Sequence, residues 1–211
     1  MTREEIKRQV TKDTLLSARK NTGRGFVPVG ISNRHVHLTQ AAVEALFGPG
    51  HQLTPMKALS QPGQFACEEK VTVEGPKGKL SGLRVLGPVR KDTQVELSVT
   101  DAFAAGIKPV VRMSGDIAGT PGCRLTGPCG SLELKEGVIV AARHLHISPE
   151  QAAVYGLKSG DQVRLRSEGP RAVVFEHVAV RSGTGHDLEV HIDFDEANCA
   201  QMKNGDLLEI I

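Results

Sequence analysis

The order of apolar and polar residues separates a helical N-terminal segment from a longer segment with the character of β-strands. In residues 1–20, Ile6, Val10 and Leu15 or Leu16 recur near the helical period, with charged residues between them. The glycines at residues 21–25 then break this pattern. We predict an N-terminal amphipathic helix and linker over residues 1–23. Two interpretations of this helix stay open: it packs on the body of the protein, or it is a docking peptide.

After residue 25, short apolar runs alternate with turns that contain glycine and proline. Many short strands with frequent turns are typical of β-barrels rather than of a parallel α/β sheet. We predict short helices at about 39–47, 149–155 and 194–202. The predicted strands are 26–32, 71–74, 83–86, 95–99, 137–146, 162–166, 173–181, 188–192 and 207–211.

A short motif is repeated along the chain. The sequence RHVHLT at residues 34–39 recurs as RHLHIS at residues 143–148, and HID at residues 191–193 repeats its last part. In each copy a histidine precedes an apolar residue and then Thr, Ser or Asp, which are preferred helix N-caps. His37, His146 and His191 should therefore each end a strand that leads into a short helix. The repeat predicts a mainly β fold of two pseudo-symmetric β-barrels with short capping helices, in addition to the N-terminal helix.

The histidines of the repeat form pairs that can bind a metal ion. Residues i and i+2 of a strand project to the same side, so His35 lies beside His37, and His144 beside His146. A His-x-His pair on a strand suits zinc or another borderline divalent metal. One such pair alone is more often an ordinary surface pair. Two Arg-His-x-His copies, with a matching His191, favour a metal site.

Two further residues can complete such a site. Glu96 lies between apolar neighbours of a predicted strand, where a buried carboxylate needs a partner. A metal ion would be one, and a solvent-facing position is the alternative. Arg90 precedes this strand, and a guanidinium suits phosphate, although most arginines are surface residues. The turn at residues 112–116 carries donors that can face an oxyanion.

Composition excludes several classes of protein. The 26 basic and 24 acidic residues nearly balance, and only six Phe and one Tyr supply aromatic rings, so we expect no nucleic-acid partner. No apolar run is long enough for a membrane span, and the charged N-terminus is not a secretory signal. None of the four cysteines belongs to a CxxC pair, which argues against a cysteine-based zinc finger and fits the reducing cytoplasm.

Taken together, the motifs identify a family. The segments at residues 29–38, 94–96, 112–115, 137–146 and 189–198 resemble the PduL-type phosphate acyltransferases, which are phosphate propanoyltransferases associated with bacterial microcompartments. The resemblance covers nearly the whole chain from about residue 25. The paired Arg-His-x-His motifs make it specific.

The resemblance implies two β-barrels around a dinuclear zinc site, one from residues 24–33 with 142–211 and the other from residues 34–141. The implied ligands of one zinc ion are His35 and His37. The implied ligands of the other ion are Glu96, His144, His146 and His191. The implied catalytic residue is Arg90, which binds phosphate together with Ser114 and Asn198. The implied coenzyme A groove is lined by Ser32, Lys57, Arg84 and Leu86.

The implied reaction is acyl-CoA plus phosphate giving acyl phosphate plus CoA, with a short acyl chain such as propionyl or acetyl. The implied location is a microcompartment lumen within the cytoplasm, where residues 1–20 contact shell or cargo proteins. Homo-oligomerisation is left open. Two alternatives use the same residues: a zinc-dependent hydrolase of thioesters or phosphoesters, and a non-catalytic scaffold or cargo protein with closed structural zinc sites.

Overall fold

The chain folds into two compact units. The computed structural model describes residues 2–211. The first unit combines the segment that ends at Ser32 with Arg143–Ile211, and the second unit is Asn33–Ala142. Each unit has its own cluster of buried apolar side chains. The chain therefore leaves the first unit after one strand and returns to it to complete the fold.

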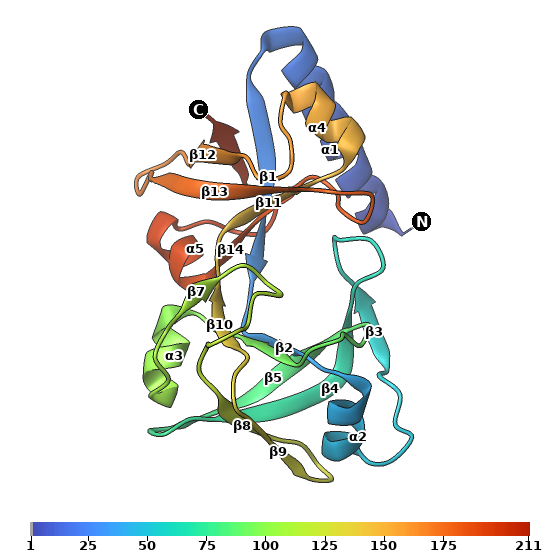
Figure 1. Cartoon of the computed structure of the whole chain (residues 1–211). Coiled ribbons are helices and arrows are strands. Elements are labelled where there is room, and N and C mark those ends of the chain that lie inside the picture. Colours follow the sequence, from blue (N-terminus) through green and yellow to red (C-terminus); the bar gives the residue numbers. More distant parts are fainter. Residues whose placement is uncertain (1) are drawn as a thin grey trace. The chain divides into compact units, whose positions relative to one another are not determined.

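The first unit is built on a closed six-stranded barrel (Figure 1). β1 closes the ring because it pairs in parallel with β14 on one side and antiparallel with β15 on the other. Buried and exposed residues alternate along β12, the pattern of a strand with one face on a core. The barrel strands, in spatial order, are β1 (Gly25–Ser32), β14 (Glu189–Asp193), β11 (His144–Ile147), β13 (Val174–Ser182), β12 (Gln162–Arg166) and β15 (Leu207–Ile210).

The second unit is built on a nine-stranded sheet that curls into a half-barrel. β3 (Pro55–Ala58) pairs with β4 beside the main path of this sheet. The remaining strands, in spatial order, are β7 (Val111–Arg112), β10 (Val138–Ala141), β6 (Gln94–Glu96), β2 (His35–His37), β5 (Lys79–Gly87), β4 (Phe65–Glu74), β8 (Cys123–Thr126) and β9 (Ser131–Leu134). One closed barrel and one half-barrel, with short helices, confirm the predicted fold class.

Four strands pass directly into short helices by the same local device. The helices are α2 (Gln40–Phe47), α3 (Val99–Ala105), α4 (Pro149–Tyr155) and α5 (Phe194–Ala200). Each begins after an extended cap residue whose side-chain oxygen accepts the backbone N–H three residues on, and the caps are Thr39, Ser98, Ser148 and Asp193. The predicted position of His37, His146 and His191 before a capped helix is confirmed. Glu96 occupies the same position before Ser98.

Several predicted strands have other bounds in the structure, and two of them also differ in how they pair or where they end. The apolar run at residues 137–146 is two strands, β10 and β11, because β10 pairs with β6 and β7 whereas β11 pairs with β13 and β14. The run crosses from one unit to the other, and an apolar pattern does not reveal where a strand changes partners. The strand predicted at residues 95–99 ends at Glu96, because Ser98 caps α3, a helix that the apolar pattern did not indicate.

The N-terminal helix α1 (Arg3–Thr22) packs on the first unit. It begins with a capping box between Thr2 and Glu5 and ends at Gly23, which adopts the left-handed conformation (φ 72°). Leu15 belongs to the core of this unit, and α1 lies beside α4 (Figure 1). This arrangement favours the packed interpretation. Within residues 2–211, no helix has both the length and the apolar character that crossing a membrane requires.

Candidate active site

A first group of metal-ligand side chains lies in the second unit, where β2 and β6 run antiparallel. His35 is the register partner of Glu96, and His37 projects to the same side of β2 as His35. All three side chains are buried, and their ligand atoms lie within 4.8 Å of one another. The Nε2 atoms of His35 and His37 are 3.1 Å apart, and Nε2 of His35 is 3.5 Å from Oε2 of Glu96.

The surroundings of this group set its charge and tautomer. Nδ1 of His35 lies 2.7 Å from the carbonyl oxygen of Asn33, which can only accept a hydrogen bond, so Nδ1 carries the proton and Nε2 keeps its lone pair. Burial, with the nearby His35 and Arg90, lowers the pKa of His37 to about 3. Burial alone would raise the pKa of Glu96, but the adjacent His35 and His37 hold it well below its usual range. Burial alone would lower the pKa of His35, but the Glu96 carboxylate raises it above its usual value. A carboxylate, the neutral ring of His37 and the ring of His35 therefore converge here.

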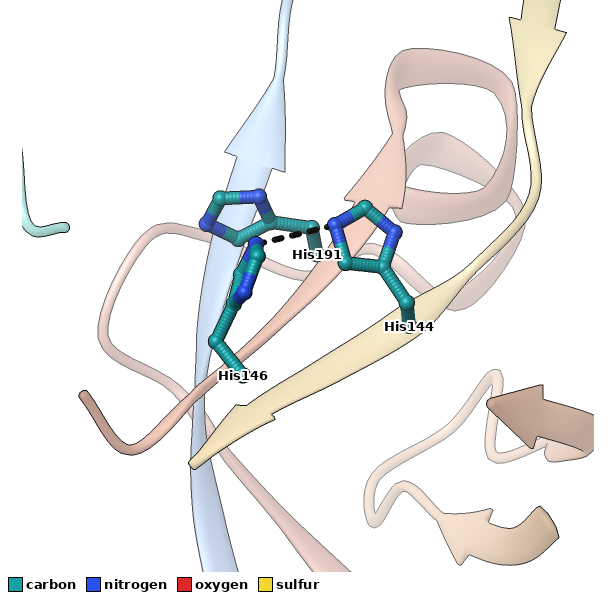
Figure 2. A group of neighbouring side chains, drawn as sticks. All are labelled: His144, His146 and His191. Carbon is teal, nitrogen blue, oxygen red and sulfur yellow. Dashed lines mark hydrogen bonds between the residues drawn. The ribbon is translucent and has the colours of Figure 1, made fainter. Parts of the chain in front are cut away.

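A second group lies in the first unit, where β11 and β14 run antiparallel. Figure 2 shows His144 and His146 projecting from one strand toward His191 on the other. Nε2 of His144 is 3.0 Å from Nε2 of His146, and the ligand atoms of the three residues lie within 4.8 Å of one another. Burial and the neighbouring His191 and His144 lower the pKa of His146. Three imidazoles in this arrangement are a typical donor set for Zn²⁺.

Two residues that sequence reasoning missed support the second group. Nδ1 of His186 lies 2.9 Å from Nδ1 of His146, and Oε2 of Glu189 lies 2.7 Å from Nε2 of His191. The i, i+2 spacing of Glu189 and His191 on a strand could have indicated their contact. His186 belongs to no motif. It lies in the loop between β13 and β14 and reaches His146 from there, so its contact depends on the folded path of this loop.

Arg90 lies at the edge of the first group. Its backbone N–H donates to the carbonyl oxygen of Leu38 (2.8 Å), which fixes the loop beside β2. Its guanidinium donates to the hydroxyl of Ser114 (3.2 Å), and that hydroxyl donates to Oε1 of Glu96 (2.9 Å). The amide of Gln94 also donates to Oε1 of Glu96 (2.6 Å). The structure thus brings together Arg90, Ser114 and Glu96, although they are separated along the chain.

The other predicted site residues are placed as follows. Arg84 lies on β5 as the register partner of His35, and its guanidinium donates to the carbonyl oxygen of Cys67. Lys57 is exposed on β3, and Leu86 is half-buried on β5. The first unit holds the remaining two: Ser32 ends β1, and Asn198 is exposed on α5. Their roles toward CoA and phosphate stay predictions.

Within the second unit, Glu96 lies beside His35 and His37. The resemblance assigns it instead to the ligand set of His144, His146 and His191. That assignment joins residues of both units and stays a prediction.

The two buried cysteines are poorly suited to be nucleophiles. Burial raises the pKa of Cys67 to about 11 and that of Cys123 to about 12, so both thiols are protonated at neutral pH. Cys129 and Cys199 are exposed, and neither belongs to the two groups of metal-ligand side chains. This distribution agrees with chemistry that uses no cysteine nucleophile.

Fold and site define a class: a mainly β protein with two groups of candidate metal ligands and an arginine beside one of them. The sequence model of the family described as phosphate propanoyltransferase matches residues 28–203. The chain is 52% identical over 184 residues to a phosphate propanoyltransferase of Thermotoga maritima, covering 87% of this chain and 88% of that protein. It is 50% identical over 193 residues to one of Rhodobacter capsulatus, covering 92% and 90%.

A phosphate propanoyltransferase of Salmonella typhimurium is also 50% identical, over 179 residues that cover 84% of this chain and 85% of that protein. The chain belongs to the phosphate propanoyltransferase family. It is a phosphate acyltransferase, and phosphotransacylase activity with CoA as a substrate follows from that membership.

Proposed function

We propose that this enzyme interconverts a short-chain acyl-CoA, such as propionyl-CoA or acetyl-CoA, and phosphate with the acyl phosphate and CoA, at a dinuclear zinc site. The observation that carries the proposal is the matched placement of two groups of metal-ligand side chains. In each unit a His-x-His strand pairs antiparallel with a strand that supplies a third donor. In the second unit, Ser114 also links this group to Arg90.

The donor sets fit zinc. The hydrogen bond from Nδ1 of His35 to Asn33 places the lone pair of the neutral ring on Nε2, the atom that faces His37 and Glu96. The lowered pKa of His37 keeps that ring neutral. The three imidazoles of the first unit lie within reach of a single ion. Zinc bound at these groups supplies Lewis acidity toward the carbonyl oxygen and a soft site for the thiolate sulfur.

The residues of the chain meet the other needs of the reaction. Arg90 offers a planar, always charged fork that binds phosphate oxygens in two places and orients the nucleophile. The Ser114 hydroxyl accepts a hydrogen bond from Arg90 and donates one to Glu96, so it fixes the positions of the guanidinium and the carboxylate relative to each other. A phosphate oxygen forms the new bond to the thioester carbon, the carbon–sulfur bond breaks, and CoA leaves as a thiolate that takes a proton from solvent. No acyl-enzyme is formed.

We also propose that α1 directs the enzyme to the lumen of a bacterial microcompartment. Leu15 of α1 faces the core, whereas Ile6 and Val10 are 48% and 58% exposed one turn apart. A helix that is docked by one face and carries exposed apolar residues on another can contact a shell or cargo protein.

The test is release of CoA from acyl-CoA esters of increasing chain length, with and without phosphate, before and after metal removal by a chelator. We expect release that requires phosphate, is lost with the chelator and returns on adding Zn²⁺. Equal release without phosphate would instead show a hydrolase. Metal binding without any CoA release would show a scaffold, and full activity without bound metal would reject the dinuclear site.

A further inference from the structure

Glu189 is an acidic residue in direct contact with a candidate metal ligand of the first unit. It lies two residues before His191 on β14, so both side chains leave the same side of the strand. Oε2 of Glu189 and Nε2 of His191 are 2.7 Å apart, and the Glu189 side chain is 13% exposed. A carboxylate accepts the N–H of a neutral imidazole. In that tautomer Nδ1 of His191 keeps the lone pair that a cation requires.

A glycine on the neighbouring strand makes room for this carboxylate. Gly30 of β1 is the register partner of His191. A Cβ atom at Gly30 would lie 2.7 Å from both Cδ and Oε2 of Glu189 and 3.0 Å from Cδ2 of His191. Unlike many glycines of the chain, Gly30 has no positive φ, so its backbone does not require glycine. The space that Glu189 fills is the physical reason for glycine at this position.

The second unit contains the same arrangement, but the hydrogen-bond donor and acceptor have exchanged positions. The registers of the β2–β6 and β11–β14 pairs make Glu96 the counterpart of His191, and Gln94 the counterpart of Glu189. Gln94 donates its amide to Oε1 of Glu96 (2.6 Å). The carboxylate ligand thus has a hydrogen-bond donor two residues earlier, and the imidazole ligand has an acceptor there. Each partner suits the residue that it contacts.

We propose that Glu189 is a positioning residue for His191, and that Gly30 provides the opening it needs. Glu189 holds the imidazole in one tautomer and one orientation, with Nδ1 left for the ion. Partners of this kind commonly change metal affinity 10–100-fold when they are removed. The inference deepens the proposed function, because it rests on an ion at His144, His146 and His191.

The test measures metal affinity, which does not depend on turnover. The full chain, with the group in the second unit disabled by His37→Ala, is stripped of metal and titrated with Zn²⁺ against a chromophoric chelator. We expect Glu189→Ala to weaken binding about 10–100-fold. Glu189→Gln, whose amide oxygen still accepts from Nε2 of His191, should stay closer to the parent.

Gly30→Ala displaces the carboxylate without changing Glu189 itself. It should weaken Zn²⁺ binding at least as much as Glu189→Ala does, because the new Cβ atom also lies 3.0 Å from Cδ2 of His191. The double variant should lose less than the sum of the two single losses, because both changes remove the contact between Glu189 and His191. Glu176→Ala is the matched control. It removes an acid of the same unit that pairs with Arg164 on the surface, and it should not change affinity. Thermal unfolding without metal shows that each variant is folded.

Unchanged Zn²⁺ affinity in Glu189→Ala would overturn the role of Glu189 and leave the proposed function intact. Additive losses in the double variant would overturn the role of Gly30. Absence of Zn²⁺ binding in the His37→Ala parent would overturn both this inference and the dinuclear site. The result for the parent therefore separates the two failures.

Discussion

At the residue scale, the candidate ligands share one structural position. His37, Glu96, His146 and His191 each lie two residues before a helix N-cap, at or near the end of a strand. The residue that follows each of them is apolar and buried in a core. Because side chains alternate along a strand, the ligand must then point away from that core. The buried apolar residue that follows and the N-cap residue after it together set the direction of the ligand side chain, whether it is histidine or glutamate.

Replacing Arg90 with alanine should abolish most of the activity while the enzyme stays folded. Arg90 is half-buried, so the change leaves no large cavity. We expect kcat/KM for phosphate to fall about 10²–10³-fold, as for loss of a charged group at an oxyanion. Arg90→Lys should recover only part of the activity, because an ammonium lacks the planar fork.

Arg124→Ala is the control, since Arg124 is a surface arginine of the same unit and pairs with Glu133. The measurement is kcat/KM for phosphate, from steady-state kinetics at varied phosphate concentration, in the parent and in each variant. Unchanged turnover of Arg90→Ala at limiting phosphate would show that another residue binds the nucleophile.

At the scale of elements, α1 is anchored by an ion pair as well as by Leu15. Lys12 is only 5% exposed, and its ammonium pairs with Asp187, which precedes β14. Asp187 also accepts from the amide of Gln151 on α4 (2.7 Å). The residue before Asp187 is His186, which contacts His146. The helix therefore braces the loop that supports the second group of metal-ligand side chains.

Replacing Asp187 and replacing Lys12 should lower the free energy of unfolding by unequal amounts, although each change breaks the same ion pair. Asp187→Asn leaves the Lys12 ammonium buried without its counter-charge, and we expect a loss of about 2–4 kcal/mol in the free energy of unfolding. Lys12→Met removes the ammonium but keeps an apolar side chain in the buried space, and Asp187 still accepts the hydrogen bond from Gln151. The free energy of unfolding should therefore fall by about 1 kcal/mol or less. Urea unfolding measures both, with exposed Lys7→Met as the control. A larger loss for Lys12→Met than for Asp187→Asn would contradict this asymmetry.

The pH dependence of the Asp187 effect has a defined sign. Burial raises the pKa of Asp187, but the hydrogen bonds from Lys12 and Gln151 outweigh burial and hold it below its usual 3.8. The unfolded chain therefore binds this proton more readily, so the stabilisation is complete above about pH 4 and is lost as the pH falls. The difference in unfolding free energy between the parent and Asp187→Asn should shrink from pH 6 to pH 3. A constant difference would argue against an ion pair.

At the scale of the whole molecule, each unit combines its own core with its own group of metal-ligand side chains. An ion that binds only the folded form stabilises it by about 2.7 kcal/mol when present at 100 times its dissociation constant. Removing the metal should therefore lower the melting temperature. His37→Ala and His191→Ala should each lose part of the stabilisation gained on adding Zn²⁺. Identical melting with and without Zn²⁺ would show that the two groups do not bind it.

Much of this protein could be predicted from local patterns. The Arg-His-x-His repeat, the caps Thr39, Ser148 and Asp193, and the turn-rich spacing of short strands predict a duplicated β fold with histidines in pairs. These features depend on residues within a few positions of one another, where side-chain alternation and capping act. The same patterns also show Glu96 as a candidate, because a carboxylate among apolar neighbours requires a partner. Arg90 is a candidate because it precedes this strand and a guanidinium suits phosphate.

The tertiary structure alone decided which strands became neighbours. It divided the run at residues 137–146 between two units, because β10 and β11 have different pairing partners. It brought Ser114 between Arg90 and Glu96, set His186 against His146, and opposed Gly30 to His191. Such contacts join residues far apart in the chain. They depend on register and on the space left between strands, which no local pattern contains.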